Sequence, residues 1–188
     1  MKRRNMRNLI ILVVLLIALI AVYCVVRYRA QKTQEAEEAE TSESVLDLVT
    51  SEVESIQFTL DGQQVSFVKT DDVWTLEGED TFEVESSAVE EAISAVAGMT
   101  SERTLEDVED LAEYGLDQPV QTVVLKTKEG VTHNIYFGNT NDSTGNDYVY
   151  VDDNSTKVYT IGSSVAQTYS GTLEDYRVVE EETTETTE

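Results

Sequence analysis

The chain has 188 residues, a formal net charge of −24 and a single cysteine, Cys24. All 37 Asp and Glu residues lie beyond position 34, whereas seven of the 13 Lys and Arg residues lie within the first 32. Nucleic acid repels so acidic a body, so we expect no nucleic-acid partner. The lack of any other cysteine excludes disulfides and thiolate metal sites from the body.

An uncharged apolar stretch at residues 9–26 follows a short basic head at residues 1–8. As a helix it would span about 27 Å, close to the thickness of the hydrocarbon core of a bilayer. We therefore predict a transmembrane helix. A cleaved signal peptide is the alternative, but cleavage after Ala30 would put Tyr28 where a small residue is needed. A lipid anchor at Cys24 is disfavoured because a bulky residue precedes it.

Three segments follow the predicted span: an acidic linker at residues 27–44, a domain at residues 45–179 and a disordered acidic tail at residues 180–188. The linker and tail have too few large apolar residues to form a core. Lys and Arg differ by only four to three across the span, too little to fix its orientation. The basic head and large polar body favour an amino terminus inside the cell and a domain outside.

Strand patterns open the domain. Apolar and polar residues alternate on both sides of the Asp61-Gly62 turn and again after Asp71-Asp72, which predicts a meander with one buried face. Adjacent carboxylates such as Asp71-Asp72 could serve acid–base chemistry, but in a turn they are ordinarily solvated. The predicted inward residues are Ile56, Phe58, Leu60, Val65, Phe67, Trp74 and Leu76.

Helical patterns come next. Ser87 and Glu90 form the pattern of a capping box, and an apolar stripe then continues until Gly98, which predicts a helix covering the meander. A second, shorter helix is predicted after Thr104. The stripe of the first helix is Val89, Ala92, Ile93 and Val96, and that of the second is Leu105, Val108, Leu111 and Ala112.

The run YGLDQP, from Tyr114 to Pro119, is typical of a helix stop. Gly115 can take the left-handed conformation past the last turn, and Leu116 can then pack back on Leu111. Pro119 prevents the helix from restarting. This structural reading explains the motif without a ligand.

Strand patterns resume with Val123 and Leu125 and, after a turn at residues 128–130, with Ile135 and Phe137. Further strands are predicted at residues 148–151 and 158–161, and two short helical pieces near 165–169 and 173–176. Each half of the domain thus contains a hairpin, a third strand and a helix. We predict an α+β fold made of two duplicated meander-plus-helix units behind the transmembrane helix.

Trp74 with Leu76, the YGLDQP run, Phe137-Gly138 and the closing LEDYR at residues 173–177 together resemble the domain-of-unknown-function family forty-three-forty, over roughly residues 56–178. The most specific part is Tyr114, Gly115, Leu116, Asp117 and Pro119. The resemblance implies an anchored extracytoplasmic domain, and related domains occur in gliding-motility auxiliary proteins associated with ABC transporters. It implies an accessory role and brings no catalytic residues.

Catalytic chemistry lacks the residues it would need. His133 is the only histidine and, in a strand pattern, is expected to be exposed and structural. Gly162-Ser163-Ser164 lacks the second glycine of a nucleophile elbow, and no phosphate-binding glycine motif occurs. We therefore predict no enzyme activity and no cofactor.

Two binding alternatives remain in the loop at residues 139–147 and in nearby tyrosines. The weak calcium candidates of this loop are Asn139, Asn141, Asp142 and Asp147. However, Thr144 and Tyr150 occupy the positions where a calcium-binding loop needs glycine and glutamate, which favours an ordinary hairpin loop. The tyrosines could form an aromatic binding face or simply stabilise the sheet. They are Tyr136, Tyr148, Tyr150 and Tyr159.

The leading hypothesis is a single-pass cell-membrane protein whose outer domain is an interaction or accessory module, serving a transporter or envelope complex. The alternative is an extracytoplasmic sensor that binds calcium or a glycan through residues 139–147 and the neighbouring tyrosines.

Overall fold

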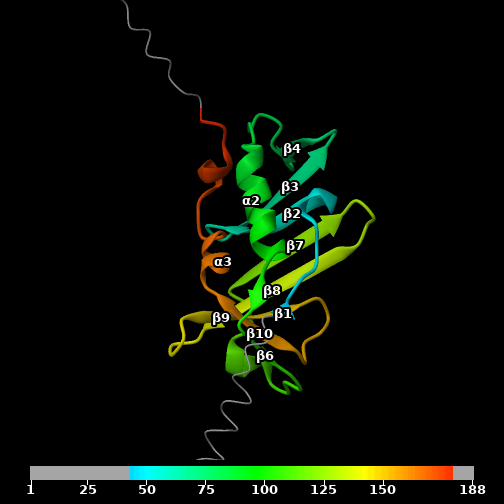
Figure 1. The fold of residues 1–188 in the computed structure, drawn as a ribbon. Helices are drawn as coiled ribbons and strands as arrows, with labels where there is room; N and C mark the ends of the chain where they lie inside the picture. Colours follow the sequence, from blue (N-terminus) through cyan, green and yellow to red (C-terminus); the bar gives the residue numbers. More distant parts are fainter. Residues whose placement is uncertain (1–42, 180–188) are drawn as a thin grey trace, which may run out of the picture. The chain divides into compact units, whose positions relative to one another are not determined.

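A computed structural model of the chain describes residues 43–179, which form one eight-stranded antiparallel sheet with a few short helices (Figure 1). The strand order is β4-β3-β2-β7-β8-β9-β10-β6. The strands are β2 (Val53–Leu60), β3 (Gln63–Thr70), β4 (Val73–Leu76), β6 (Arg103–Leu105), β7 (Gln121–Thr127), β8 (Thr132–Thr140), β9 (Asn146–Val151) and β10 (Val158–Gly162). A separate two-stranded ladder joins β1 (Glu43–Ser44) to β5 (Thr100–Ser101).

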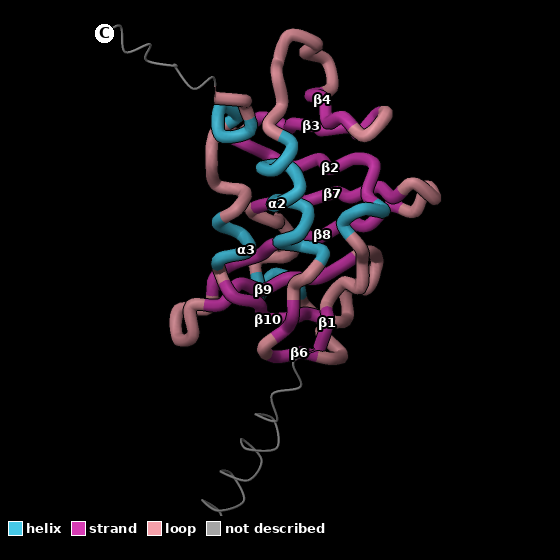
Figure 2. The backbone as a smooth tube through the Cα atoms, turned by 45° about the horizontal axis from the view of Figure 1, so that its top comes forward, coloured by secondary structure: helices cyan, strands magenta, loops and turns pink. Residues whose placement is uncertain are grey.

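The helices α2 (Ser86–Ala97) and α3 (Ser164–Gln167) lie over the same face of the sheet (Figure 2). Three single-turn 3₁₀ helices complete the fold: η1 (Thr50–Glu52), η2 (Leu111–Tyr114) and η3 (Leu173–Tyr176). Within residues 43–179, the other face of the sheet has no helix longer than the single turn η2. This asymmetry leaves most of one sheet face open.

The predicted meander is confirmed, because β2, β3 and β4 pair in succession through the turns at Asp61-Gly62 and Asp71-Asp72. The expected overall class is only partly confirmed. The described chain is mainly β, and its two hairpins join through the antiparallel pair β2–β7 into one sheet. The second half has only the four-residue α3 where a matching helix was expected, so a duplicated pair of units is not evident.

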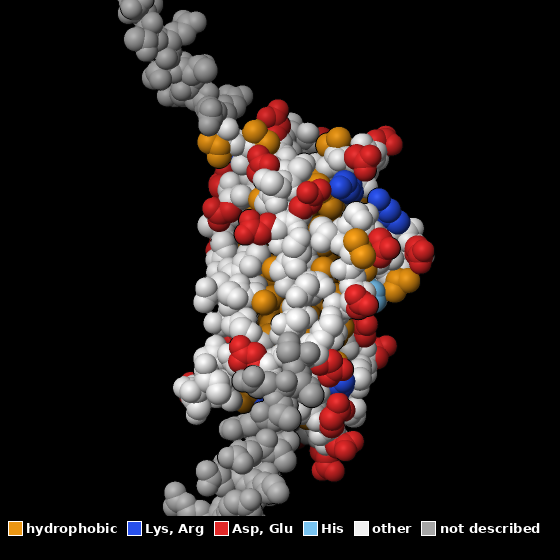
Figure 3. Space-filling view, viewed as in Figure 1, with side chains coloured by type: hydrophobic (Ala, Val, Ile, Leu, Met, Phe, Trp, Pro, Cys, Tyr) orange, Lys and Arg blue, Asp and Glu red, His pale blue; other side chains and the backbone are white. Residues whose placement is uncertain are grey.

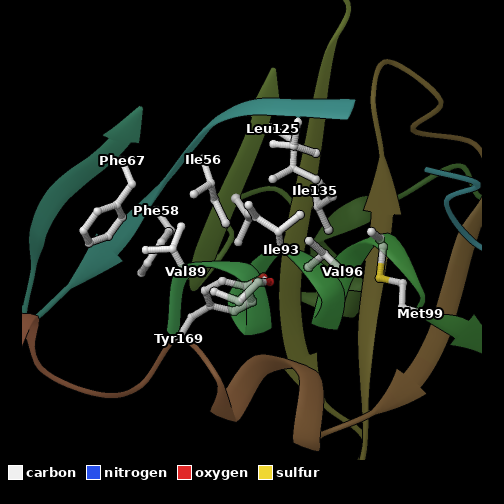
Figure 4. Close-up of a cluster of buried hydrophobic side chains, with 14 of the residues drawn as sticks. Ile56, Phe58, Phe67, Val89, Ile93, Val96, Met99, Leu125, Ile135 and Tyr169 are labelled. Atoms are coloured by element: carbon white, nitrogen blue, oxygen red, sulfur yellow. The ribbon is translucent and has the colours of Figure 1, made fainter. Parts of the chain in front are cut away.

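The core lies between α2 and the sheet (Figure 4). All four residues predicted for the stripe of α2, Val89, Ala92, Ile93 and Val96, have no exposed surface. The seven inward residues predicted for the meander are buried as well. Hydrophobic periodicity therefore identified the two surfaces that pack together.

Two predicted helix features are wrong. The segment expected as a second helix after Thr104 is instead the end of β6 followed by an irregular stretch and the single turn η2. The amino-terminal cap of α2 is Glu85, whose carboxylate accepts hydrogen bonds from the Ser87 backbone N–H and hydroxyl. The hydrogen bond from the Ser87 hydroxyl, and then that from its backbone N–H, stabilise the charged carboxylate and so lower the pKa of Glu85.

The Asp71-Asp72 turn carries backbone strain that its counterpart avoids. Both turns place two successive residues at positive φ, with Asp61 at 49° and Gly62 at 76° in the first, and Asp71 at 49° and Asp72 at 66° in the second. A glycine adopts this conformation without steric cost, whereas an aspartate does not. The second turn is thus the less favourable of the two.

We expect Asp72→Gly to raise the free energy of unfolding by about 0.5 kcal/mol, because it relieves left-handed strain at some cost in the entropy of the unfolded chain. Urea denaturation followed by the fluorescence of Trp74 measures the change. The matched variant Gly62→Asp should shift stability in the opposite direction. Stabilisation by both substitutions would contradict the strain argument.

Two tyrosines close the core beside α2. Tyr169 packs edge-on against Phe58 with ring centroids 5.1 Å apart, and its hydroxyl donates a 2.5 Å hydrogen bond to the Ala92 carbonyl. Tyr176 packs against Phe67 with the two rings tilted and their centroids 5.1 Å apart. Burial, and then the charges of Asp175 and Glu91, raise the pKa of Tyr176 to about 12. Burial also raises the pKa of Tyr169.

We expect the protein to lose stability between about pH 10 and pH 12. A raised tyrosine pKa means that folding disfavours the phenolate, so the stabilisation is complete below the ordinary pKa near 10 and is lost as pH approaches the folded value. The urea midpoint should fall over this range, in step with tyrosinate absorbance. Tyr176→Phe should show a smaller fall, and an alkaline loss identical to that of wild type would contradict this assignment.

The predicted membrane span at residues 9–26 lies outside the described residues. Within residues 43–179, no helix is both long and apolar enough to cross a membrane.

Candidate interaction surface

The open face of the sheet, which we define as the face opposite α2, is lined mainly by uncharged polar residues, valines and tyrosines, with Lys126 and Arg103 at its margins. Strand pairing fixes its members, because Val68 pairs with Ser55, Gln57 with Val124, and Tyr136 with Tyr150. Side chains directly paired across strands lie on the same face. The central residues are Gln57, Thr59, Ser66, Val68, Thr122, Val124, Asn134, Tyr136, Tyr148 and Tyr150.

This face is almost free of carboxylates, although the protein has 37 of them. No paired strand position on the open face of the described chain is Asp or Glu. Glu54 approaches it from the bulge in β2, where its carboxylate lies 2.6 Å from the Lys126 amine. On the opposite, helical side, carboxylates gather towards both ends and along the edges (Figure 3). Charge is therefore distributed unevenly over the domain.

Four tyrosines form a cluster at one end of the open face. The rings of Tyr136 and Tyr150 stack with centroids 4.4 Å apart, and those of Tyr114 and Tyr148 meet edge to face at 4.9 Å. The Asn141 side-chain amide donates a 2.6 Å hydrogen bond to the Tyr148 hydroxyl. Burial, then the neighbouring Tyr136 and the charge of Asp153, raise the pKa of Tyr150.

The predicted aromatic face needs one correction. Tyr159 pairs with Val149 on the core side, is only 9% exposed and lies under Lys157, whose amine is 5.2 Å from the ring. Sequence alternation could not assign its face, because the register of β10 against β9 is set by tertiary pairing. Tyr114 takes its place in the cluster, and its position in YGLDQP was the only sequence signal that marked it.

An acidic wall, which we define as residues 106–117, borders the tyrosine cluster. It is held at three points: the Val108 N–H donates to the Thr156 carbonyl at 2.9 Å, Tyr114 contacts Tyr148, and Leu116 is buried against Gly138. Its carboxylates are Glu106, Asp107, Glu109, Asp110, Glu113 and Asp117.

The wall ends in the predicted helix-stop geometry, although on a 3₁₀ turn. Gly115 has φ 68°, and its N–H donates to the Ala112 carbonyl. The Leu116 N–H donates to the Leu111 carbonyl at 3.0 Å. Together these bonds make the Schellman pattern. Leu116 does not join the main core but packs on the open side of β8, so the YGLDQP motif attaches the wall to the sheet.

The calcium candidates point to different partners. Asn139 lies against Gly115, Asn141 accepts hydrogen bonds from the Ser143 and Thr144 backbones, and Asp147 accepts from the Thr140 hydroxyl at 2.6 Å. Asp142 has no side-chain hydrogen bond among the described residues. Over residues 43–179, no group of three or more His, Cys, Asp or Glu side chains is placed to hold a metal ion.

Two further predicted positions have structural surroundings. Nδ1 of His133 lies 3.2 Å from Asp152, whose other carboxylate oxygen accepts from the Asn134 N–H, so the pair orders the turn after β9. Trp74 is only 2% exposed, with the Lys69 amine 5.4 Å from its ring and no hydrogen-bond partner for its indole nitrogen within the described part.

Fold and surface together define a mainly β domain with one helical face and one open, tyrosine-bearing face. The chain belongs to the family described as "Domain of unknown function (DUF4340)", whose model matches residues 74–182. The match begins at β4, so β2 and β3 lie outside it although they belong to the same sheet. No curated protein and no solved structure matched the chain.

Proposed function

We propose that this chain is a single-pass membrane protein whose extracytoplasmic domain is an interaction module for a transporter or envelope complex. The observation that carries the proposal is the open face of the sheet, which combines tyrosines, valines and uncharged polar residues in an otherwise acidic domain. Depletion of charge together with enrichment in tyrosine is the compositional signature of protein interfaces. The apolar stretch at residues 9–26 supports attachment to the membrane.

Two measurements test the placement of the domain. If residues 9–26 span the membrane, carbonate washing should leave the full-length protein in vesicles. If the domain is outside, protease added to intact cells should remove its carboxyl-terminal part. Release by carbonate or complete protection from protease would contradict the proposal.

Copurification tests the accessory role. After mild crosslinking and detergent extraction, the full-length protein should be recovered with a membrane protein in a fixed ratio. The matched control is a chain with residues 9–26 intact and an unrelated outer domain, which should recover no such partner. Recovery of the protein as a lone species would count against an accessory role.

The sensor alternative is favoured by one contact. The bond from Asn141 to Tyr148 links the loop at residues 139–147 to the tyrosine cluster, so a ligand at the loop would reach the open face. A sensor of this kind would bind calcium or a neutral glycan. Millimolar calcium should then raise the melting temperature, and Asp142→Ala should abolish the rise. If calcium does not shift the melting temperature, the hypothesis of a calcium sensor is wrong. If neutral oligosaccharides do not shift it, the hypothesis of a glycan sensor is wrong.

A further inference from the structure

We infer that the open face binds a protein surface with an uncharged centre and a basic rim, and that the acidic wall sets the orientation of that partner. This inference rests on the proposed function and specifies its site and the chemistry of its partner. It concerns the open face around Val124 and the four-tyrosine cluster.

The centre of the open face has the features of an interface core. Val124 lies on a central strand and is flanked on neighbouring strands by Gln57 and Asn134. Amide side chains and tyrosine hydroxyls can donate and accept hydrogen bonds, so they can pair with a partner without burying an unpaired charge. Tyrosine is also among the residues that dominate binding energy in protein interfaces.

Where the wall borders the face, the rim is mainly acidic, and Arg103, which pairs with Thr160 on the open face, is the one basic residue on the edge strand there. Glu106 is engaged by Lys157 at 3.4 Å and Asp110 caps the Ala112 N–H at 2.9 Å. The remaining wall carboxylates make no side-chain hydrogen bond or ion pair within the described residues: Asp107, Glu109, Glu113 and Asp117. These four unengaged carboxylates outnumber Arg103, and Lys126 is paired with Glu54, so the acidic rim complements Lys and Arg on a partner.

The wall is rigidly placed for such a role. The Schellman bonds at Gly115, the burial of Leu116 against Gly138 and the Tyr114–Tyr148 contact fix its position on the sheet. A pre-positioned charged rim avoids the entropic cost of ordering a loop on binding. Its charges therefore act mainly on the rate and orientation of association.

Charge also disfavours the other occupants. A second copy would bring an equally acidic domain against the first, and like charges across an interface cost affinity. Nucleic acid and anionic lipid are repelled for the same reason. A basic protein surface is the occupant that the charges favour.

The experiment uses the full-length chain in its own membranes, with a photo-crosslinking amino acid in place of Val124. The control carries the same amino acid in place of Thr81, an exposed, uncharged residue in the loop between β4 and α2. We expect a discrete adduct with another protein from position 124 and none from position 81. The crosslinked peptide, identified by mass spectrometry, should lie beside clustered Lys or Arg residues.

Two charge variants with equal net charge separate the wall from general acidity. The wall variant is Glu109→Gln, Glu113→Gln and Asp117→Asn, and the matched variant in the β4–α2 loop is Glu79→Gln, Asp80→Asn and Glu83→Gln. The wall variant should reduce adduct yield about threefold or more, and the loop variant should leave it unchanged. Equal effects of the two variants would overturn the role of the wall.

The remaining outcomes are decisive too. An adduct of two copies of this chain, an adduct with a peptide lacking basic neighbours, or no adduct from position 124 overturns the inference. If copurification recovers a membrane partner while position 124 gives no adduct, the proposed function stands and only this surface is wrong. If neither experiment recovers a partner, both fail.

Discussion

Phe58→Ala should lower the free energy of unfolding by about 3–5 kcal/mol, the range expected when a fully buried aromatic side chain is removed. Phe58 is 1% exposed, and its ring lies 5.1 Å from Tyr169, 5.6 Å from Tyr176 and 6.0 Å from Phe67. Removing it leaves a cavity where strands β2 and β3 meet the carboxyl-terminal segment, and aromatic contacts are lost as well.

Urea denaturation followed by Trp74 fluorescence measures this loss. The matched control is Gln57→Ala, because Gln57 is the adjacent residue of β2 and points to the open face. Its substitution should change the free energy of unfolding by less than about 0.5 kcal/mol. Similar losses for both variants would contradict the assignment of faces to β2.

Gly138→Ala should destabilise the domain by about 3 kcal/mol and displace the acidic wall. A β-carbon at this position would lie 2.2 Å from the Tyr114 carbonyl oxygen and 2.8 Å from Leu116 Cγ. The first contact is with backbone, which cannot move aside by changing rotamer. Relief therefore requires the wall to shift away from β8.

The control for this prediction is Gly162→Ala at the end of β10, where the nearest atom to an added β-carbon is the Ser164 hydroxyl at 3.8 Å. That variant should be close to wild type in its urea midpoint. Gly138→Ala should also reduce the adduct from position 124, since the wall no longer borders the open face correctly. A Gly138→Ala protein as stable as the Gly162→Ala protein would contradict the close packing of the wall.

Predictions from local sequence patterns were right for some elements and wrong for others. Local patterns located the meander, α2 and the stop at Gly115, because alternation, helical periodicity and left-handed glycines depend on neighbouring residues. The same patterns failed after Thr104. There the apolar spacing of Leu105, Val108 and Leu111 matched a helix, but pairing with β10 and packing on β8 gave a strand and a single turn.

Local sequence patterns also could not predict the side-chain hydrogen bonds between residues that are distant in the chain. The Gln121 amide donates to the Thr59 carbonyl at 2.7 Å, and its oxygen accepts from the Thr59 N–H at 3.2 Å. The β2–β7 backbone pairing ends at Gln57–Val124. Beyond that point the Gln121 side chain takes the place of a backbone partner for Thr59. Residues 62 positions apart in the chain make these bonds, and no local pattern marks them.

For the candidate site, the sequence named three of the four clustered tyrosines and the whole YGLDQP motif. It could not join them, since the contact of Tyr114 with Tyr148 depends on how the wall folds back over β8 and β9. It also placed Tyr159 on the wrong face. Strand register sets the face of each side chain, and register depends on partners distant in the chain.

The amino-acid sequence by itself was enough to establish the acidic charge of the body and the apolar stretch at residues 9–26. It also predicted which faces of the meander and of α2 are buried. These follow from hydrophobicity and spacing, which are properties of neighbouring residues. Only the tertiary structure decided that both hairpins share one sheet, that one face stays open and that the acidic wall borders the tyrosines. Those features depend on pairing between segments far apart in the chain. The free energy of such pairing belongs to both segments together and cannot be predicted from either one alone.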